Sequence, residues 1–446
     1  MATVIITAIG SAGDVHPLIG IGAALAARGH RIVFCTHPPF AALAEQRGFQ
    51  FMPIGTQTDY EAALADPAMW NPRTSFRTLW SVIAPTLRPH FDTLRSLMDD
   101  DTVLVGTLWA FSARLIQELY GVPLVSVQVS PSTLLSAHAP PTHPRLTIPR
   151  RLPLALKTGL LGMIEHYVLD KVCGPTLNAL RQELGLAPVR RIMGDWLHSP
   201  DGVLCAFPDW FARPQPDWPK PHLLSGFPLF NDIGTPVPDR GLEDFLAAGE
   251  RPLVFTAGST LVDHRSYACA VGESLRATGL RGILLTPDAE PAQAQHARRD
   301  AQTVLLRRRY VPMRTLLPRC RALVHHGGIG TAALAYAAGI AQIVTPFAHD
   351  QFDNAQRVAD SGCGIRLDAP VSGRSLARAI EQVLSSPSIA TQCGRVQDRL
   401  STAADGCESA AGYIEQFVVR RVTPERAAAA AAAAAAGIDL PQEQPA

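Results

Sequence analysis

The feature that most constrains the fold is a regular alternation of short β-branched runs with helical patterns. Residues 3–9 (TVIITAI), 31–36 (RIVFCT) and 49–55 (FQFMPIG) have the composition of strands, and the segments between them have the apolar spacing of helices. A second series of the same kind begins at residues 252–260 (PLVFTAGST). Strands connected through helices pair in parallel and carry helices on both faces. The sequence therefore predicts an α/β fold built from two doubly wound parallel sheets.

The length of 446 residues also favours two domains, because single domains seldom exceed about 250 residues. Residues 226–241 are rich in proline and glycine, and we interpret them as the linker. We expect an N-terminal domain over residues 1–225 and a C-terminal domain over residues 242–420. The remaining residues, 421–446, include a run of alanines, which predicts a frayed helix or a disordered tail without a catalytic role.

The charge balance and the cysteines narrow the choice of partners and environment. A formal net charge of +1 gives no general attraction for nucleic acid. The eight cysteines are scattered without a C-x-x-C pair, which is typical of a reducing compartment, so we expect a cytoplasmic protein. The N-terminus lacks the basic region and the long apolar core of a signal peptide.

Residues 151–172 come nearest to a membrane span, but Lys157, Glu165 and His166 interrupt the apolar sequence at helical spacing. The segment is therefore predicted to be an amphipathic helix. Two interpretations remain open for its apolar face, which are packing on the protein core and contact with a membrane surface.

Two glycine-containing loops follow predicted strands, one at residues 8–17 (AIGSAGDVHP) and one at residues 324–339 (VHHGGIGTAALAYAAG). Ligands of parallel sheets bind beyond the carboxyl ends of the strands. In the second loop, glycines allow a ligand to approach the backbone, and the helix that follows offers unpaired N–H groups to an anion. His326 can donate to a phosphate oxygen and Thr331 can add a hydroxyl, which suits a diphosphate leaving group. The interpretation of His325 as a residue bonded only to backbone also remains open.

Other chemistries find little support in the sequence. Adjacent histidines point in different directions and no third ligand stands at a usual spacing, so we expect no metal. The loop at residues 8–17 does not fit the dinucleotide pattern G-x-G-x-x-G, so the sequence gives no support to an oxidoreductase. The chain also contains no G-x-S-x-G, the motif that would indicate a hydrolase.

Four motifs in this order resemble those of GT-B glycosyltransferases related to the UDP-glycosyltransferases. They are GSAGDVHP near the N-terminus, FTAGST, RRYVP, and HHGGIGT followed by AGIAQIVTPFAHDQFDNA. The resemblance covers nearly the whole chain except the tail, and it implies two Rossmann-like domains facing a central cleft. Further segments in both halves, among them GTLWAFSARL, WLHSPDGV and AHDQFDNAQR, resemble one group within this family, the rhamnosyltransferases of rhamnolipid biosynthesis.

The resemblance implies roles for individual residues in binding the donor. Tyr310 would stack on the nucleobase and the backbone of Val311 would read its edge, while Asp350 and Gln351 would hold the sugar hydroxyls. The implied contacts near the diphosphate are Ser259, His326, Gly328, Gly330, Thr331 and Asn354.

The sequence departs from the family pattern at two positions. Many UDP-dependent relatives carry a glutamate for the ribose hydroxyls where this chain has Leu334. A deoxyribose has no 2′-hydroxyl, so this loss agrees with a dTDP-sugar donor, although apolar packing explains a leucine on a helix equally well. The usual proline is replaced by Ala341, which affects only the local geometry of the strand entry.

Transfer of a sugar requires a base for the attacking hydroxyl. Asp14 lies where the family carries this base, and we interpret it as the catalytic residue. His16 is the alternative, and a role for Asp14 in capping a helix is the structural alternative.

The implied reaction is an inverting, metal-independent transfer of L-rhamnose from dTDP-L-rhamnose to the hydroxyl of a 3-(3-hydroxyalkanoyloxy)alkanoate, without a cofactor. Candidates for the acceptor wall are Trp109, Phe111, Leu134 and Leu135, each of which could equally belong to the core. The implied partners are the acyltransferase that makes the lipid acceptor and the surface of the inner membrane. Transfer to a macrolide, sterol or other lipophilic acceptor, and a non-catalytic GT-B partner subunit, are the alternatives.

Overall fold

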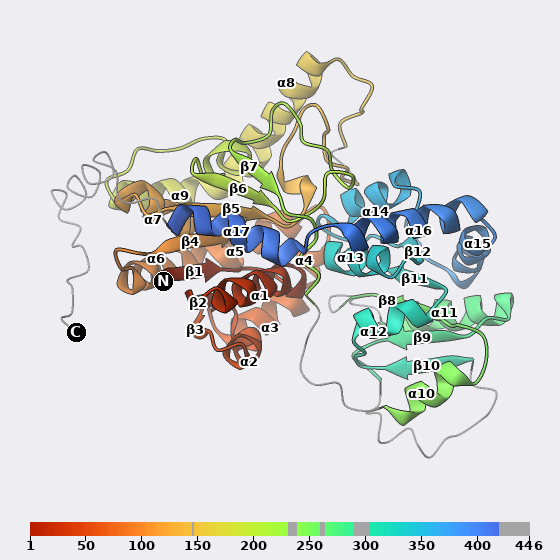
Figure 1. Ribbon diagram of the computed structural model, residues 1–446. Coiled ribbons are helices and arrows are strands. Elements are labelled where there is room, and N and C mark those ends of the chain that lie inside the picture. The colour runs from red at the N-terminus through yellow and green to blue at the C-terminus, as the bar shows by residue number, and fades with distance from the viewer. Residues whose placement is uncertain (145–146, 231–238, 259–263, 290–303, 419–446) are drawn as a thin grey trace. The chain divides into compact units, whose positions relative to one another are not determined.

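The computed structural model describes residues 1–144, 147–230, 239–258, 264–289 and 304–418, and it divides into two compact units. The described residues within 1–69, 73–230 and 404–418 form the first unit, and those within 70–72 and 239–403 form the second. Each unit is built on its own parallel sheet (Figure 1).

The first sheet has seven strands in the order β3-β2-β1-β4-β5-β6-β7, all parallel. In its centre, Val4 of β1 is in register with Ile32 of β2 and with Val103 of β4. The strands are β1 (Thr3–Thr7), β2 (Arg31–Thr36), β3 (Gln50–Pro53), β4 (Val103–Thr107), β5 (Leu124–Gln128), β6 (Gly202–Cys205) and β7 (His222–Leu224).

Helices cover both faces of this sheet because successive side chains of a strand point to opposite sides. Val4 and Ile6 pack into one apolar core with α1, whereas Ile5 between them packs into a second core with α6 and α7. The helices of this unit are α1 (Ala12–Ala27), α2 (Ala41–Gln46), α3 (Gln57–Ala65), α4 (Pro67–Trp70), α5 (Ser75–Ile83), α6 (Leu87–Leu97), α7 (Phe111–Tyr120), α8 (Leu154–Ile164), α9 (Asp170–Glu183) and α17 (Gly406–Val418).

The last helix corrects the predicted domain boundary. We expected residues up to 420 to belong to the C-terminal domain, but α17 packs beside α1 in the first unit (Figure 1). Ile414 is fully buried in the same apolar core as Val4, and Arg28 at the end of α1 forms an ion pair with Glu415. The apolar stripe of a helix is visible in the sequence, but the sheet that covers the stripe is not.

The second sheet has six parallel strands in the order β10-β9-β8-β11-β12-β13. The two parallel sheets confirm the predicted α/β architecture. The strands are β8 (Leu253–Thr256), β9 (Gly282–Leu285), β10 (Leu305–Arg308), β11 (Ala322–His325), β12 (Ala341–Val344) and β13 (Gly364–Arg366). The helices are α10 (Arg240–Ala247), α11 (His264–Thr278), α12 (Met313–Leu316), α13 (Ile329–Ala337), α14 (Gln351–Asp360), α15 (Gly373–Leu384) and α16 (Pro387–Thr402). Half of the predicted linker, residues 231–238, and the alanine-rich tail lie outside the described residues.

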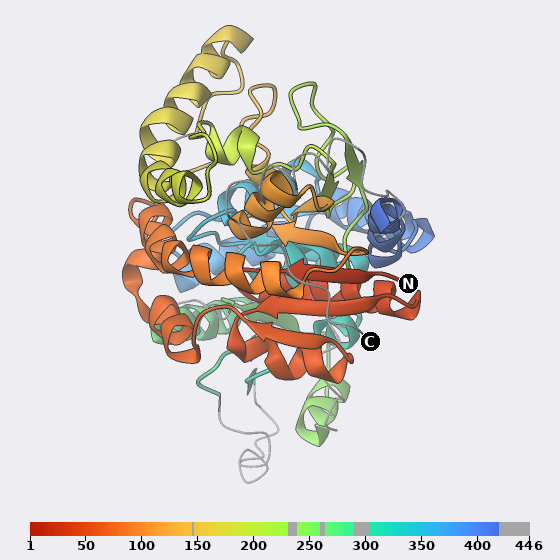
Figure 2. The same ribbon diagram turned by 90° about the vertical axis from the view of Figure 1, so that its left-hand side faces the viewer.

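The segment predicted as one amphipathic helix over residues 151–172 is two helices, α8 and α9, joined by a π-helical turn at Glu165–Leu169. Its polarity is the reverse of the expected pattern, because the charged residues Lys157 and Glu165 are buried while Leu156 and Tyr167 are exposed. Both ribbon views show α8 at the margin of its unit, away from the sheet (Figures 1 and 2). None of the described helices is long and apolar enough to cross a membrane.

Candidate active site

The loop after β1 places Asp14 in the first turn of α1, where it forms a capping box with Ser11. The backbone N–H of Ser11 donates to Oδ2 of Asp14 over 2.9 Å, and the Ser11 hydroxyl caps the helix by accepting from the N–H of Gly13 over 3.3 Å. Gly10 has a φ of 138°, and a Cβ there would lie 2.3 Å from Oδ2 of Asp14. Only glycine therefore fits against this carboxylate, which stabilises the helix end and remains half-buried.

His16, the alternative base, points elsewhere. Its ring packs edge-on against Phe40 with the ring centroids 6.0 Å apart, and burial lowers its pKa. Asp14 instead influences Tyr60, whose pKa rises to about 12 through burial and, second, through the charge of Asp14. The two candidate bases therefore face different surroundings, and which of them acts stays a prediction.

His325, the last residue of β11, is a fully buried structural residue. Its Nδ1 accepts from the N–H of Gly327 over 3.2 Å, so its Nε2 carries the proton and donates to Oε1 of Gln342 over 3.0 Å. Burial, followed by the neighbouring His326, lowers the pKa of His325 to about 3. His325 therefore holds the loop in its neutral form, and because it bonds to the Gln342 side chain as well as to backbone, the interpretation of a histidine bonded only to backbone is wrong.

His326 is held between two glycine backbones. A Cβ on Gly328 would lie 2.6 Å from its Nε2, and a Cβ on Gly258 would lie 2.8 Å from its Cε1. Its Nδ1 is buried and has no hydrogen-bond partner among the described residues. Burial lowers its pKa to about 4, so the ring is neutral at pH 7. The glycines thus fix a neutral imidazole whose Nδ1 is enclosed and makes no hydrogen bond within the described part of the chain.

The helix α13 begins directly beside this imidazole. Gly328 is its N-cap and supplies no side-chain acceptor, so the N–H groups of the first turn, including those of Gly330 and Thr331, lack a side-chain cap. An uncapped helix start with a positive dipole end is suited to bind an anion such as a phosphate. Thr331 is half-buried within this turn.

Residues at the start of α14 hold the loop from the other side. The buried Asn354 donates from Nδ2 to the carbonyl of Gly327 over 2.9 Å and to Oδ2 of Asp350 over 2.8 Å. Gln351 uses Oε1 to accept from the N–H groups of Phe347 and Ala348, at 3.0 and 3.1 Å. The structure therefore brings His326, Asp350, Gln351 and Asn354 together and indicates a positioning role for the last two.

Two residues of this site were missed by the analysis of the sequence. Gln342 fixes the tautomer of His325, and a buried glutamine in the otherwise apolar strand β12 was the available signal. His349 has a positive φ of 51°, and burial lowers its pKa to about 4. Because residues other than glycine rarely adopt such a φ, the backbone just before Asp350 is locally strained.

The remaining predicted donor residues differ in exposure. The Tyr310 ring is 47% exposed and accessible to a base, whereas the Val311 side chain is buried and leaves only backbone for recognition. Leu334 packs against the same apolar core as Val311, which supports the packing explanation for that position. Ser259 lies outside the described residues.

Of the four residues predicted to form the acceptor wall, two are buried and two are partly exposed. Phe111 is fully buried in the core between Trp80 and Trp196, at centroid distances of 5.1 and 5.9 Å, and Leu134 is only 2% exposed. Neither side chain is accessible to an acceptor in this structure. Trp109 and Leu135 are only partly buried and stay candidates.

The described residues contain no group of three histidines, cysteines or acidic residues placed to hold a metal ion. The requirement for a metal or cofactor stays untested, and the expected donor is a substrate rather than a resident group.

Known proteins resemble the chain over both units. Residues 4–139 match the glycosyltransferase family 28 N-terminal domain, and residues 291–415 match the C-terminal domain of erythromycin biosynthesis protein CIII-like proteins. Glycosyltransferase GtfC of Amycolatopsis orientalis is 30% identical over 94% of this chain and 98% of its own length. The O-mycaminosyltylonolide 6-deoxyallosyltransferase of Streptomyces fradiae is 29% identical over 93% of this chain and 97% of its own length.

Solved structures confirm the fold. The glycosyltransferase of kitacinnamycin superposes with a TM-score of 0.68 at 20% identity, covering 94% of this chain and 99% of its own. The spinosyn rhamnosyltransferase SpnG in complex with thymidine diphosphate superposes with a TM-score of 0.60 at 19% identity, covering 94% and 100%. With both domains and the full-length relative in agreement, the chain belongs to the GT-B glycosyltransferases of the family 28 and erythromycin CIII-like type, and it is a hexosyltransferase.

Proposed function

We propose that this glycosyltransferase transfers L-rhamnose from dTDP-L-rhamnose to the hydroxyl of a 3-(3-hydroxyalkanoyloxy)alkanoate, with inversion at the anomeric carbon. The main support for binding of a nucleotide-sugar donor is the neutral His326. Its ring is fixed between Gly258 and Gly328, with a buried Nδ1, beside the uncapped start of α13. A diphosphate can accept from this imidazole and from the backbone N–H groups of the helix.

The proposed chemistry is a single displacement. Asp14 accepts the proton of the acceptor hydroxyl as its oxygen forms a bond to the anomeric carbon, and the bond from that carbon to the diphosphate oxygen breaks. The charge that develops on the leaving diphosphate is stabilised by the His326 N–H and by the first turn of α13. Asp350 is proposed to orient the sugar hydroxyls together with the amide nitrogen of Gln351, whose oxygen holds the loop.

The thymidine and rhamnose parts of the proposal have separate support. The absence of a ribose-binding carboxylate at Leu334 agrees with a deoxyribose, and two of the structurally similar glycosyltransferases, VinC and SpnG, were solved with thymidine diphosphate. SpnG is itself a rhamnosyltransferase. The segments resembling rhamnosyltransferases of rhamnolipid biosynthesis lie in both halves of the chain.

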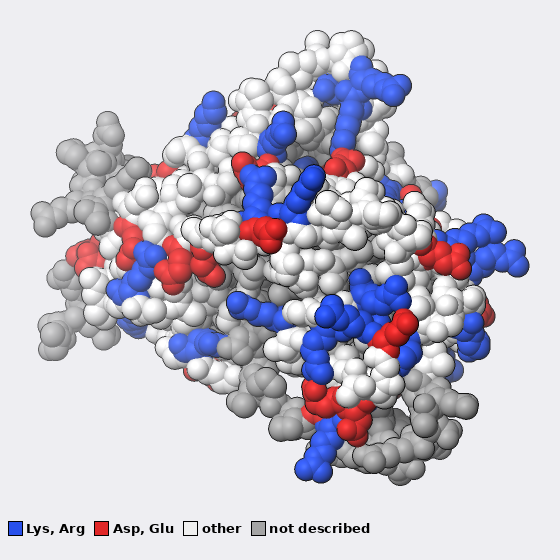
Figure 3. All heavy atoms as spheres, turned by 45° about the vertical axis from the view of Figure 1, so that its right-hand side comes forward, with Lys and Arg blue, Asp and Glu red and all other residues white. Residues whose placement is uncertain are grey.

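A lipid acceptor is supported by the exposed apolar side chains of α8 and the turn that follows it. Leu154, Leu156, Met163 and Tyr167 are 44%, 57%, 51% and 66% exposed. Arg150 and Arg151 are exposed immediately before the helix, and Figure 3 shows a largely uncharged upper surface with Lys and Arg side chains beside it. An apolar helix face flanked by basic residues favours peripheral contact with an anionic membrane.

A second candidate acceptor class is a macrolide or related aglycone, which the tylonolide in the name of the Streptomyces fradiae relative favours. The deciding experiment offers the purified chain dTDP-L-rhamnose or UDP-glucose together with the fatty-acid dimer, a macrolactone or a sterol, and identifies products by mass spectrometry. We expect a deoxyhexosyl product from dTDP-L-rhamnose and the fatty-acid dimer. A product with the macrolactone alone would replace the proposed acceptor, and no product from any pair would favour a non-catalytic subunit that supports the acyltransferase partner.

A further inference from the structure

Two buried polar side chains meet at the carboxyl edge of the first sheet, and the proposed function gives neither of them a role. Gln128 is the last residue of β5, and His198 lies shortly before β6, the neighbouring strand. Nε2 of Gln128 and Nδ1 of His198 are 3.2 Å apart, and the two residues are only 1% and 6% exposed. Oε1 of Gln128 and Nε2 of His198 are both buried and have no partner among the described residues.

The chemistry of the pair follows from this contact. The amide nitrogen of Gln128 can only donate, so Nδ1 of His198 accepts and the ring proton lies on Nε2. Burial lowers the pKa of His198 to about 4, which keeps the ring neutral at pH 7. The pair therefore offers one unused N–H donor and one unused carbonyl acceptor. Each buried polar group left unsatisfied costs about 1–3 kcal/mol, so two in direct contact indicate a missing partner.

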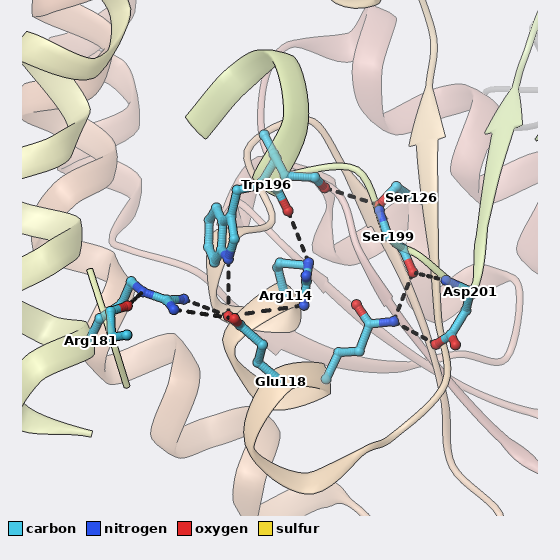
Figure 4. A network of polar contacts seen from close by, with 10 residues as sticks. Arg114, Glu118, Ser126, Arg181, Trp196, Ser199 and Asp201 are labelled. Atoms are coloured by element: carbon cyan, nitrogen blue, oxygen red, sulfur yellow. Dashed lines mark hydrogen bonds and ion pairs between the residues drawn. The ribbon is translucent and has the colours of Figure 1, made fainter. Parts of the chain in front are cut away.

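The segment that carries His198 is held firmly on both sides. Trp196 donates from its indole N–H to Glu118 over 3.0 Å, and its carbonyl accepts from Nε of Arg114 over 2.9 Å (Figure 4). The next anchor is Ser126 of β5, whose hydroxyl accepts from the N–H of Ser199 over 2.9 Å (Figure 4).

Further bonds complete this support. Arg181 forms a two-fold hydrogen-bonded ion pair with Glu118 and lies over the Trp196 ring at 5.3 Å (Figure 4). Because ordered residues flank His198 on both sides, its ring is fixed in position before a ligand arrives, as a selective site requires.

The pair lies in the same unit as the proposed base and near it along the sheet edge. The loop after β1 carries Asp14, the strand β4 lies next to β1, and β5 lies next to β4. Neighbouring strands are about 4.8 Å apart, so the ends of β1 and β5 are separated by about 10 Å. The partly buried Trp109 follows the strand between them and provides an apolar surface.

We propose that Gln128 and His198 form a specificity subsite that binds a second, uncharged oxygen group of the acceptor. An ester carbonyl or a hydroxyl oxygen accepts from Nε2 of His198, and Gln128 is the positioning residue that keeps the ring proton on this nitrogen. The inference rests on the proposed function, because the ester carbonyl of a hydroxyacid dimer stands a few atoms from its attacked hydroxyl. An uncharged oxygen is favoured over a carboxylate, because the neutral imidazole offers a hydrogen bond but no charge.

The test compares two acceptors, 3-(3-hydroxydecanoyloxy)decanoate and its analogue with an ether CH2 in place of the ester carbonyl. Wild-type protein is expected to prefer the ester in kcat/KM by about tenfold, which corresponds to one hydrogen bond of about 1.4 kcal/mol. Gln128→Leu and His198→Phe are expected to reduce this preference below about threefold while the KM for dTDP-L-rhamnose changes less than twofold. His198→Gln, which keeps an N–H donor, should restore part of the preference.

The control is Tyr413→Phe, which removes a hydroxyl from α17 beside Gly202 at the opposite, amino end of β6. It should keep the full preference, and circular dichroism identifies variants that fail to fold. An unchanged preference in folded Gln128→Leu and His198→Phe proteins would overturn the subsite.

If wild-type protein glycosylates only a macrolactone, the proposed acceptor fails, and the same comparison is made with a macrolactone lacking one remote hydroxyl. If no acceptor is turned over, calorimetric binding of the ester and ether analogues supplies the comparison, and equal binding by wild-type protein would overturn the subsite.

Discussion

Replacement of Asn354 by alanine tests whether the loop at His326 and the loop at Asp350 act as one unit. Asn354 is fully buried, and its Nδ2 joins the Gly327 carbonyl to the Asp350 carboxylate over 2.9 and 2.8 Å. Alanine removes both hydrogen bonds and leaves the buried Gly327 carbonyl without this donor. We expect the free energy of unfolding to fall by about 2–3 kcal/mol, since a buried group left unsatisfied costs about 1–3 kcal/mol and the bond to a carboxylate adds to this.

The same change should weaken binding of dTDP, because Gly327 adjoins the imidazole of His326 and the start of α13. A loss of about 1.4 kcal/mol in the positioning of these donors corresponds to a tenfold rise in Kd. Isothermal titration calorimetry with dTDP measures the affinity, and urea unfolding measures the stability. Gln356→Ala on the same helix is the matched control, because within the described part of the chain the side chain of Gln356 bonds only to the surface residue Asp360. If Asn354→Ala bound dTDP within twofold of Gln356→Ala, the coupling of the two loops would be refuted.

Three further predictions concern the N-cap of α1, the exposure of two aromatic residues and the pH dependence of stability. Ser11→Ala should lower the free energy of unfolding by about 1 kcal/mol in thermal or urea unfolding, because it removes the N-cap of α1; no change would contradict the capping role. Phe111→Ala should destabilise the protein by about 3–5 kcal/mol because it removes a buried ring, whereas Trp109→Ala should mainly raise the KM for the acceptor. The reverse pattern would show that Phe111 contacts the acceptor. The stability should also fall as the pH drops from 6.5 toward 4, because burial lowers the pKa of His325 to about 3 and that of His326 to about 4, below the ordinary value of 6.5, so the unfolded chain binds more protons in this range. Urea unfolding at pH 7 and pH 5 measures this, and equal stability at both would contradict the buried, neutral state of these rings.

Much of the architecture could be predicted from the sequence because the strand and helix periodicities are both visible in it. Strand-like runs alternating with helical spacing leave few arrangements other than doubly wound parallel sheets. The assignment of α17 could not be predicted in this way. Its apolar stripe, with Ile414 and Phe417, fits any sheet equally well, and only packing beside α1 decides which sheet it covers.

The candidate site shows the same division between local pattern and packing. The glycines around His326 signal a close backbone approach, and this geometry is present. The spacing of Ser11 and Asp14 is that of a capping box, so the sequence contained a structural role for Asp14 beside the catalytic one.

Exposure was harder to predict. An aromatic residue such as Phe111 has the same composition in a core as in a binding wall, and its burial depends on distant partners such as Trp196. Helix α8 and the turn after it are a further example, because the charged residues Lys157 and Glu165 are buried there. Their polar partners, the His138 carbonyl and Arg191, cannot be predicted from helical periodicity.

The most direct test of the central claim compares Asp14→Asn with His326→Ala in one preparation series, measuring kcat with dTDP-L-rhamnose and the Kd for dTDP. If Asp14 removes the proton and His326 holds the diphosphate, Asp14→Asn loses turnover and keeps its dTDP affinity, whereas His326→Ala binds dTDP at least tenfold more weakly. Near-normal turnover by folded Asp14→Asn protein, or unchanged dTDP affinity in His326→Ala, would contradict the account.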